Sequence, residues 1–232
     1  MIEPVLMQPV ERAITAQINL YYDVIAAASQ PAPLLIALHG YGASKWHALR
    51  EAKLIAPDGF ALAALQGPYQ HLREPKEKGG PLRYGFGWLT NFHPDDSVAV
   101  HHQALLDMIA ALMEEGRADR ERIFLLGFSQ SCALNYRFGF THPDVLRGMI
   151  GIAGGLPGDW ETSELYQPTD AAVFHLAGKS DEYYPPTRVE SYESQLKQRA
   201  TDVEFRSYDA GHEISREMRD DIRAWITSKA GV

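Results

Sequence analysis

The chain has 232 residues, of which 45% are hydrophobic and 22% are charged, a composition typical of an ordinary folded protein. The formal net charge is −8, and no run of lysine and arginine marks a surface for nucleic acid. The single cysteine, Cys132, excludes an intrachain disulfide, and no stretch reaches the ~20 apolar residues that a membrane-spanning helix needs.

The N-terminal segment lacks the basic region followed by an apolar region that marks a secretory signal peptide. We therefore expect a cytoplasmic protein without stable membrane insertion. The charge pattern predicts no nucleic-acid partner, and the sequence leaves open whether the chain is a monomer or a homodimer.

Apolar runs that could form β-strands recur along the chain. Residues 14–22 alternate roughly between apolar and polar side chains, as in a half-buried strand. Later runs are short and nearly continuous in apolar residues, which is typical of parallel strands covered on both faces. These runs cover residues 34–38, 60–65, 123–126, 149–153, 172–177 and 203–208.

Helical patterns lie between several of these runs. Apolar side chains recur at helical spacing in residues 98–115, 186–200 and 217–228. Strands that alternate with helices predict an α/β fold, with a mostly parallel central sheet and helices on both faces. No linker or repeat interrupts the pattern, so we expect one domain over residues 1–232.

The connection over residues 69–97 is unusual because it is long and rich in proline, glycine, charge and aromatic residues. Structureless connections of this length are uncommon unless they have a function. One interpretation is a loop that forms a wall of a substrate site, with Tyr84, Phe86, Trp88 and Phe92 supplying apolar surface and Trp88 assigned to substrate binding. The alternative is a surface loop whose aromatic residues only attach it to the domain.

The strongest local signal is Gly127-Phe-Ser-Gln-Ser131, between the apolar run 123–126 and a helical pattern that starts at Gln130. A serine on a tight turn between a strand and a helix forms a nucleophile elbow. The pattern is short enough to arise by chance, and the ordinary alternative is that Ser129 only caps the helix.

A serine hydroxyl needs a base to activate it, and the base needs an acid to orient it. In the α/β-hydrolase fold these residues follow in the order serine, acid, histidine, each after a strand. Asp181 follows the run 172–177 and His212 follows the run 203–208. Each residue alone could be an ordinary turn residue. The competing candidates for the acid are Glu182, Asp209 and Asp170, each less well placed after a strand than Asp181.

An ester-cleaving serine enzyme also needs hydrogen-bond donors for the oxyanion of its tetrahedral intermediate. One candidate is the backbone N–H of Gln130, directly after the serine. The other is expected after an earlier strand, where His39-Gly-Tyr-Gly42 follows the run 34–38. We assign Tyr41 as this donor, and a plain glycine-rich turn is the alternative.

Four motifs resemble the phospholipase/carboxylesterase family of α/β-hydrolases, which includes the acyl-protein thioesterases. They are Leu38-His-Gly-Tyr-Gly42, Gly127-Phe-Ser-Gln-Ser131, Gly178-Lys-Ser-Asp-Glu-Tyr-Tyr-Pro185 and Ala210-Gly-His-Glu-Ile214. The resemblance implies triad roles for Ser129, Asp181 and His212, oxyanion amides at Tyr41 and Gln130, and ester or thioester hydrolysis without a cofactor. The chain departs from the family where Ser131-Cys132 replaces the two glycines that usually follow Ser-Gln.

The sequence thus predicts a serine hydrolase that cleaves small to medium carboxylic esters, with thioesters as a further option. Its partner would be a small-molecule ester. One alternative is a serine peptidase or amidase on the same fold, and another is a ligand-binding protein that retains the fold. We expect no metal, because the adjacent His101 and His102 point in different directions on a helix and no H-E-x-x-H motif occurs.

Overall fold

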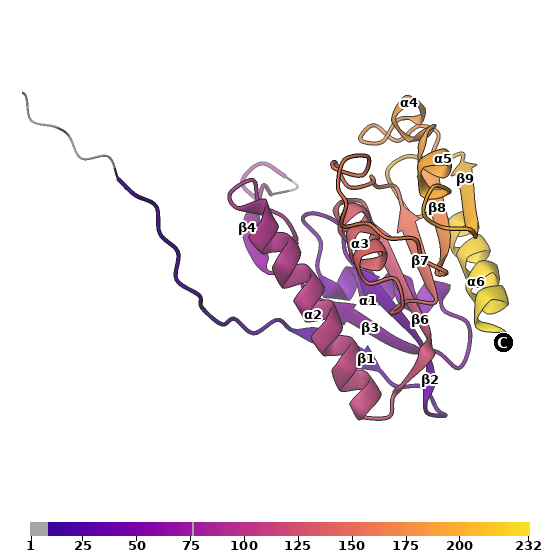
Figure 1. The fold of residues 1–232 in the computed structure, drawn as a ribbon. Coiled ribbons are helices and arrows are strands. Elements are labelled where there is room, and N and C mark those ends of the chain that lie inside the picture. The colour runs from indigo at the N-terminus through magenta and orange to yellow at the C-terminus, as the bar shows by residue number, and fades with distance from the viewer. Residues whose placement is uncertain (1–8, 76) are drawn as a thin grey trace, which may run out of the picture.

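The computed structural model describes residues 9–75 and 77–232, and a mostly parallel β-sheet lies at its centre (Figure 1). The strand order is β1-β3-β2-β6-β7-β8-β9, in which only the β1–β3 pair is antiparallel. The strands are β1 (Tyr22–Ile25), β2 (Ala32–Leu38), β3 (Ala61–Leu65), β6 (Ala118–Phe128), β7 (Gly148–Ile152), β8 (Ala172–Gly178) and β9 (Val203–Tyr208).

Helices cover both faces of this sheet, as the sequence predicted. One face carries α1 (Lys45–Ile55) and α6 (Arg216–Ala230), and the other carries α2 (Pro94–Glu114) and α3 (Gln130–Thr141) (Figure 1). Two short helices, α4 (Pro186–Val189) and α5 (Tyr192–Leu196), contact β8 and β9. Within the described residues, no helix is both long and apolar enough to cross a membrane.

The central strand β2 shows why the predicted runs are continuously apolar. Leu34 and Ile36 pack into the core beneath α2 and α3, while Leu35 and Ala37 pack into the core beneath α1 and α6. Successive side chains of a strand point to opposite faces, and both faces are covered here. Every residue of β2 is therefore buried, and burial of a leucine or isoleucine side chain stabilises the fold by about 1.5–3 kcal/mol.

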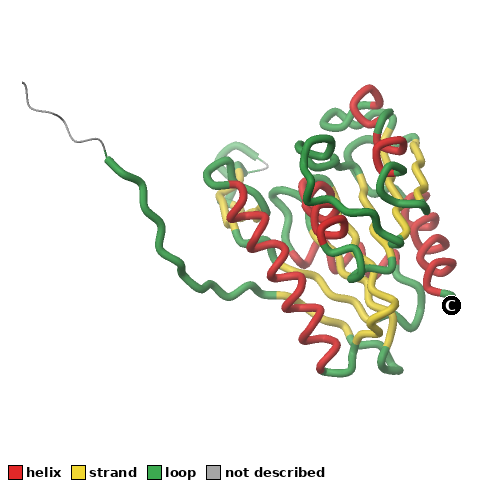
Figure 2. The backbone as a smooth tube through the Cα atoms, viewed as in Figure 1, coloured by secondary structure: helices red, strands yellow, loops and turns green. Residues whose placement is uncertain are grey.

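The prediction of a strand over residues 14–22 was wrong. Residues 9–21 form no regular secondary structure, and this segment runs away from the sheet (Figure 2). The first strand is β1, which pairs with β3 from Tyr22↔Leu65 to Ile25↔Leu62. Ile14 is 94% exposed. Alternation of side chains does not form a strand unless a neighbouring strand pairs with its backbone.

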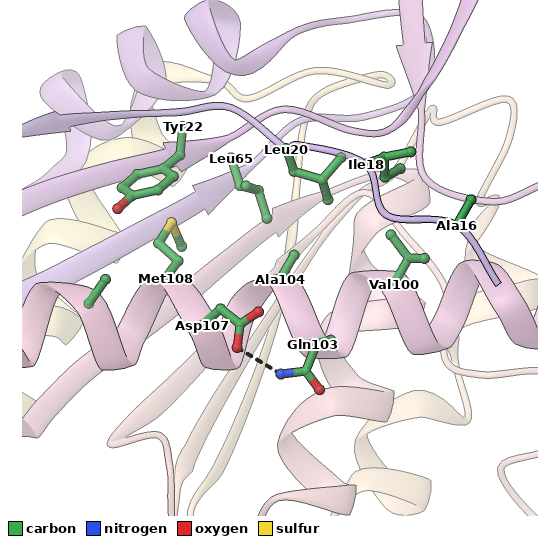
Figure 3. Close-up of a pocket in the computed structure, with 11 residues that line it drawn as sticks. Ala16, Ile18, Leu20, Tyr22, Leu65, Val100, Gln103, Ala104, Asp107 and Met108 are labelled. Atoms are coloured by element: carbon green, nitrogen blue, oxygen red, sulfur yellow. Dashed lines mark hydrogen bonds between the residues drawn. The ribbon is translucent and has the colours of Figure 1, made fainter.

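The end of this segment borders a cavity of about 460 Å³ against α2 (Figure 3). Ile18 and Leu20 line it from the segment, and Val100 and Met108 line it from α2. None of the three predicted catalytic residues lines this cavity, and Asp107 is its single charged lining residue. This cavity is therefore separate from the candidate catalytic residues.

Two further elements differ from the sequence prediction. The helix expected over residues 186–200 is split into α4 and α5, although the predicted apolar face is correct because Val189, Tyr192 and Leu196 are all buried. The connection over residues 69–97 is not structureless. It contains the antiparallel hairpin of β4 (Tyr69–Arg73) and β5 (Arg83–Gly87), followed by the first turn of α2.

Three histidines are buried in the interior as neutral groups. Desolvation lowers the pKa of His39 to about 4, and it lowers the pKa values of His101 and His175 to about 3. In the unfolded chain each of them titrates near pH 6.5. Below that pH the unfolded state binds more protons than the folded state, so the stability that is complete above pH ~6.5 is lost as the pH falls.

We therefore expect the free energy of unfolding to decrease by up to ~1.4 kcal/mol per pH unit for each of these histidines between pH ~6.5 and their folded pKa values. Urea denaturation at about pH 7.5 and about pH 5.5 measures this dependence. A free energy of unfolding that does not change across this interval would contradict the prediction.

Candidate active site

Ser129 lies on the sharp turn between β6 and α3, at the carboxyl edge of the sheet. Its φ of 56° and ψ of −115° are unusual for a residue with a side chain and cost about 1–3 kcal/mol. The Ser129 N–H donates to Ile152 O at 2.9 Å, which holds the turn against β7. Ser129 stands at the N-cap of α3, but its side chain caps no helix amide. The capping alternative therefore does not account for this serine.

Loops at the carboxyl ends of three parallel strands bring Ser129, Asp181 and His212 together. Asp181 follows β8, and His212 follows β9. The Ser129 Oγ lies 3.0 Å from His212 Nε2, and His212 Nδ1 lies 2.9 Å from Asp181 Oδ2. With its proton on Nδ1, the imidazole donates to the carboxylate and accepts from the serine hydroxyl. The three predicted residues thus form one hydrogen-bonded row.

The competing acids lie outside this row. Asp170, Glu182 and Asp209 are exposed, whereas the Asp181 side chain is fully buried. Among the described residues, Asp181 is the acid that is hydrogen-bonded to His212. The geometry therefore favours Asp181 as the acid of the row.

Aromatic rings surround the imidazole of His212. The ring centroids of Phe128, Tyr183 and Tyr184 lie 4.9, 4.8 and 6.1 Å from the imidazole centroid. Tyr183 is 60% exposed, so its ring offers apolar surface beside the candidate base. No pattern in the sequence marked these rings as neighbours of the base, although the two tyrosines closely follow the predicted acid in the chain.

The loop over residues 39–43 contains the predicted oxyanion donor Tyr41, and for that prediction we call it the oxyanion loop. It follows β2 and passes beside Ser129. A Cβ atom at Gly40 would lie 3.2 Å from Ser129 Cβ and 2.9 Å from the Phe128 ring, so the close approach requires glycine. Gln130 is the first residue of α3, where the helix amides favour negative charge. Both predicted donors, Tyr41 and Gln130, therefore belong to backbone segments that meet at Ser129.

The structure does not give Trp88 the substrate-facing position that its predicted role in binding requires. Its side chain is fully buried, and its indole Nε1–H donates to His39 O at 2.7 Å. The Trp88 backbone N–H donates to Gln130 Oε1 at 2.9 Å. In this conformation a fully buried ring offers no surface to a substrate, so the structure does not support direct binding by Trp88. The expectation failed because the ring packs under the oxyanion loop.

Ser131 and Cys132, which replace the two glycines usual in the family, are both bonded to the backbone. Ser131 Oγ accepts from Phe128 N–H at 3.0 Å and lies 3.1 Å from Leu38 O, so it joins the elbow to the end of β2. The Cys132 thiol lies 3.2 Å from Gly127 O. Burial raises the pKa of this thiol to about 12, so it is not a nucleophile at neutral pH.

A cavity of about 300 Å³ adjoins the candidate site. Gly40 and Phe128 line it from the side of the serine, and Glu213 and Ile214 line it just after His212. Its lining includes the apolar Leu38 and Leu126 of the sheet and charged side chains from α1 and α6. Within residues 9–75 and 77–232, no group of three or more His, Cys, Asp or Glu side chains is placed to hold a metal ion.

The mostly parallel sheet and the elbow at its carboxyl edge define an α/β-hydrolase. The crystal structure of the Bacillus cereus carboxylesterase has this fold, with a TM-score of 0.72 at 16% identity over 90% of this chain and 94% of that chain. Acyl-protein thioesterase 1 of Eremothecium gossypii is 30% identical over 217 residues, which are 87% of this chain and 90% of that protein.

Residues 19–229 match the family model described as phospholipase/carboxylesterase, and the chain belongs to this family of hydrolases. NocK of Nocardia uniformis subsp. tsuyamanensis is 27% identical over 160 residues, which are 66% of this chain. That match spans 41% of NocK, so the chain corresponds to less than half of that relative. The family resemblance inferred from the four motifs is confirmed.

Proposed function

We propose that the chain hydrolyses carboxylic esters, with Ser129 as the nucleophile, His212 as the general base and Asp181 as the acid that orients the imidazole. One observation carries this proposal. Ser129, His212 and Asp181 form a row with heavy-atom separations of 3.0 and 2.9 Å, and the serine stands on a strained elbow. Membership of the phospholipase/carboxylesterase family supports the same reaction class.

In this mechanism Ser129 Oγ attacks the ester carbonyl carbon while its proton passes to His212 Nε2. The backbone N–H groups of Tyr41 and Gln130 stabilise the oxyanion of the tetrahedral intermediate. The alcohol leaves with the proton from His212, and an acyl-enzyme remains on Ser129. Water then attacks the acyl group with His212 as base, which releases the carboxylic acid and restores the serine.

Small to medium carboxylic esters are the proposed substrates, and no cofactor is proposed. The exposed ring of Tyr183 beside His212 is consistent with apolar acyl or alcohol groups. Thioesters belong in the same test because a relative is named an acyl-protein thioesterase. A single domain over residues 1–232 and a cytoplasmic location stay predictions of the sequence.

The test is steady-state hydrolysis of p-nitrophenyl esters from acetate to palmitate, beside matched p-nitroanilides and thioesters. We expect catalytic turnover of esters, an optimum at short to medium acyl length, and no comparable turnover of anilides. The reason is that an alkoxide or phenoxide leaves more readily than an amide nitrogen. Anilide turnover that matches ester turnover would support the amidase alternative. Release of a single equivalent of product would support the ligand-binding alternative.

A further inference from the structure

The β4–β5 hairpin is bonded along the oxyanion loop by its backbone. The Gly42 N–H donates to Phe86 O at 2.8 Å, and the Phe86 N–H donates to Ala43 O at 3.1 Å. These two bonds form an isolated antiparallel bridge between Ala43 and Phe86. The hairpin therefore fixes the backbone of the loop at Gly42 and Ala43 by hydrogen bonds like those between paired antiparallel strands.

Side chains of the hairpin contact the same loop. The Arg73 guanidinium donates from Nη1 to Gly42 O at 2.8 Å, and the His71 ring stacks on the Tyr41 ring with centroids 4.4 Å apart. A Cβ atom at Gly85 would lie 2.7 Å from Gly42 Cα, so glycine at this position lets the hairpin approach the loop. His71, Arg73 and Gly85 lie on one face of the hairpin, and this face packs against the oxyanion loop.

Trp88 directly follows β5 and extends these contacts to both candidate donors. Its indole N–H donates to the carbonyl oxygen of His39, one residue before Gly40. The Trp88 backbone N–H donates to the side-chain oxygen of Gln130. The backbone N–H of Gln130 is the other candidate oxyanion donor. One residue therefore links the end of the hairpin to the two segments that meet at Ser129.

The bonds of the oxyanion loop determine where the Tyr41 N–H points. The Gly67 N–H donates to His39 Nε2 at 3.0 Å, so the imidazole proton is on Nδ1 and is donated to Gly40 O at 2.8 Å. In a planar trans peptide the C=O and the following N–H point in opposite directions. The Gly40 carbonyl is held on the protein side, so the Tyr41 N–H is directed to the other side of the peptide.

We infer that the β4–β5 hairpin and Trp88 brace the oxyanion loop, and that Trp88 and Arg73 are positioning residues for the Tyr41 N–H. This inference rests on the proposed function. An oxyanion donor is effective only when its direction is fixed before the charge develops. Trp88 donates to the peptide before Gly40, and Arg73 donates to the peptide after Gly42, so loss of either bond loosens one end of the loop without releasing its other bonds.

The first test compares Trp88→Phe with Trp160→Phe. Trp160 is a matched control because it is also buried and its indole N–H also donates to a backbone carbonyl, that of Gln195 at 3.3 Å. For Trp88→Phe we expect kcat to fall about tenfold, which is less than the roughly 10²–10³-fold cost of deleting an oxyanion donor. KM and the midpoint of the pH–rate profile should stay at the wild-type values, and Trp160→Phe should retain wild-type kcat.

An inhibitor separates loss of the oxyanion site from general damage. An alkyl trifluoromethyl ketone adds to the Ser129 hydroxyl, whose proton passes to His212, and the resulting hemiketal oxygen carries the negative charge. Its inhibition constant should rise in Trp88→Phe by the same factor as kcat falls. Binding of the corresponding carboxylic acid product, which forms no oxyanion, should not change.

The second test uses the arginines that face each other across the hairpin. Arg73 and Arg83 are paired in the β4–β5 register, but only Arg73 is hydrogen-bonded to the oxyanion loop in the described part of the chain. We expect Arg73→Met to lower kcat by about threefold to tenfold and Arg73→Lys to restore most of it, because an ammonium can still donate to Gly42 O. Arg83→Met, which removes the same charge, should match the wild type.

The inference is wrong if Trp88→Phe has the same kcat as Trp160→Phe while wild-type activity depends on Ser129. It is also wrong if kcat falls but the trifluoromethyl ketone binds as tightly as to the wild type, because the damage would then lie outside the oxyanion site. Wild-type turnover in Ser129→Ala would overturn the proposed function itself. The inference that the hairpin and Trp88 position the Tyr41 N–H would then also be wrong.

Discussion

Ser129→Ala should lower the turnover of p-nitrophenyl esters by roughly 10⁴–10⁶-fold, because it removes the atom that forms the acyl-enzyme. The row of Ser129, His212 and Asp181 acts as a unit, so loss of the nucleophile alone should cost nearly as much as loss of all three. The folded structure should be unaffected, since the Ser129 side chain caps no helix amide. The measurement is kcat/KM for the best ester of the chain-length series, with circular dichroism to check folding.

Ser131→Ala is the matched control because Ser131 lies in the same motif but its hydroxyl bonds only backbone groups of Phe128 and Leu38. Its loss should cost about 1 kcal/mol of stability and leave turnover within about tenfold of wild type. A fluorophosphonate should label the wild type and Ser131→Ala but not Ser129→Ala. Undiminished ester turnover in Ser129→Ala would exclude the proposed mechanism.

The sheet could be predicted because its strands are buried on both faces. Residues 34–38 lie within β2 and residues 172–177 lie within β8, as the continuous apolar runs indicated. The strand order could not be read from these runs, because the pairing of β2 with both β3 and β6 depends on contacts between segments distant in sequence. The local pattern of a segment predicts whether it forms a helix or a strand, but it does not predict which strands will pair with it.

The hairpin was missed because its sequence carries weak strand signals. Two of the five residues of β5 are glycines, and β4 contains the polar residues Gln70, His71 and Arg73. Glycine is unfavourable within a strand unless another backbone approaches closely. At Gly85 the backbone of Gly42 makes this close approach. The burial of Trp88 was missed for the same reason, since it depends on the loop that the hairpin covers.

The candidate site was easier to predict than its surroundings. A serine, an acid and a histidine that each follow a strand of a parallel sheet lie along the same carboxyl edge, although the strand order decides how close together they come. The sequence favoured Asp181 as the acid but left Asp209 as a competitor, because both follow strands. Only the fold shows that Asp181 is buried and hydrogen-bonded to His212.

Asp181→Asn should lower ester turnover at neutral pH by roughly 10³–10⁴-fold while leaving the geometry of the site intact. Asp181 Oδ1 accepts from the backbone N–H groups of Tyr183 and Tyr184 at 2.8 and 3.0 Å, so the amide oxygen of asparagine must take this position. The amide nitrogen then faces His212 Nδ1 and donates to it. The imidazole proton moves to Nε2, where it prevents His212 from accepting the proton of Ser129.

Asp209→Asn and Glu182→Gln are the controls, since both remove one exposed negative charge close in sequence to the triad without changing the partner of His212. Both should retain turnover within about twofold of wild type, because exposed charges interact weakly through water. The measurement is kcat/KM for an ester near pH 7, together with the rate of labelling by a fluorophosphonate, which also needs a base for Ser129. If Asp181→Asn matched the two controls, the imidazole would be oriented by another group, and the role of Asp181 would be structural.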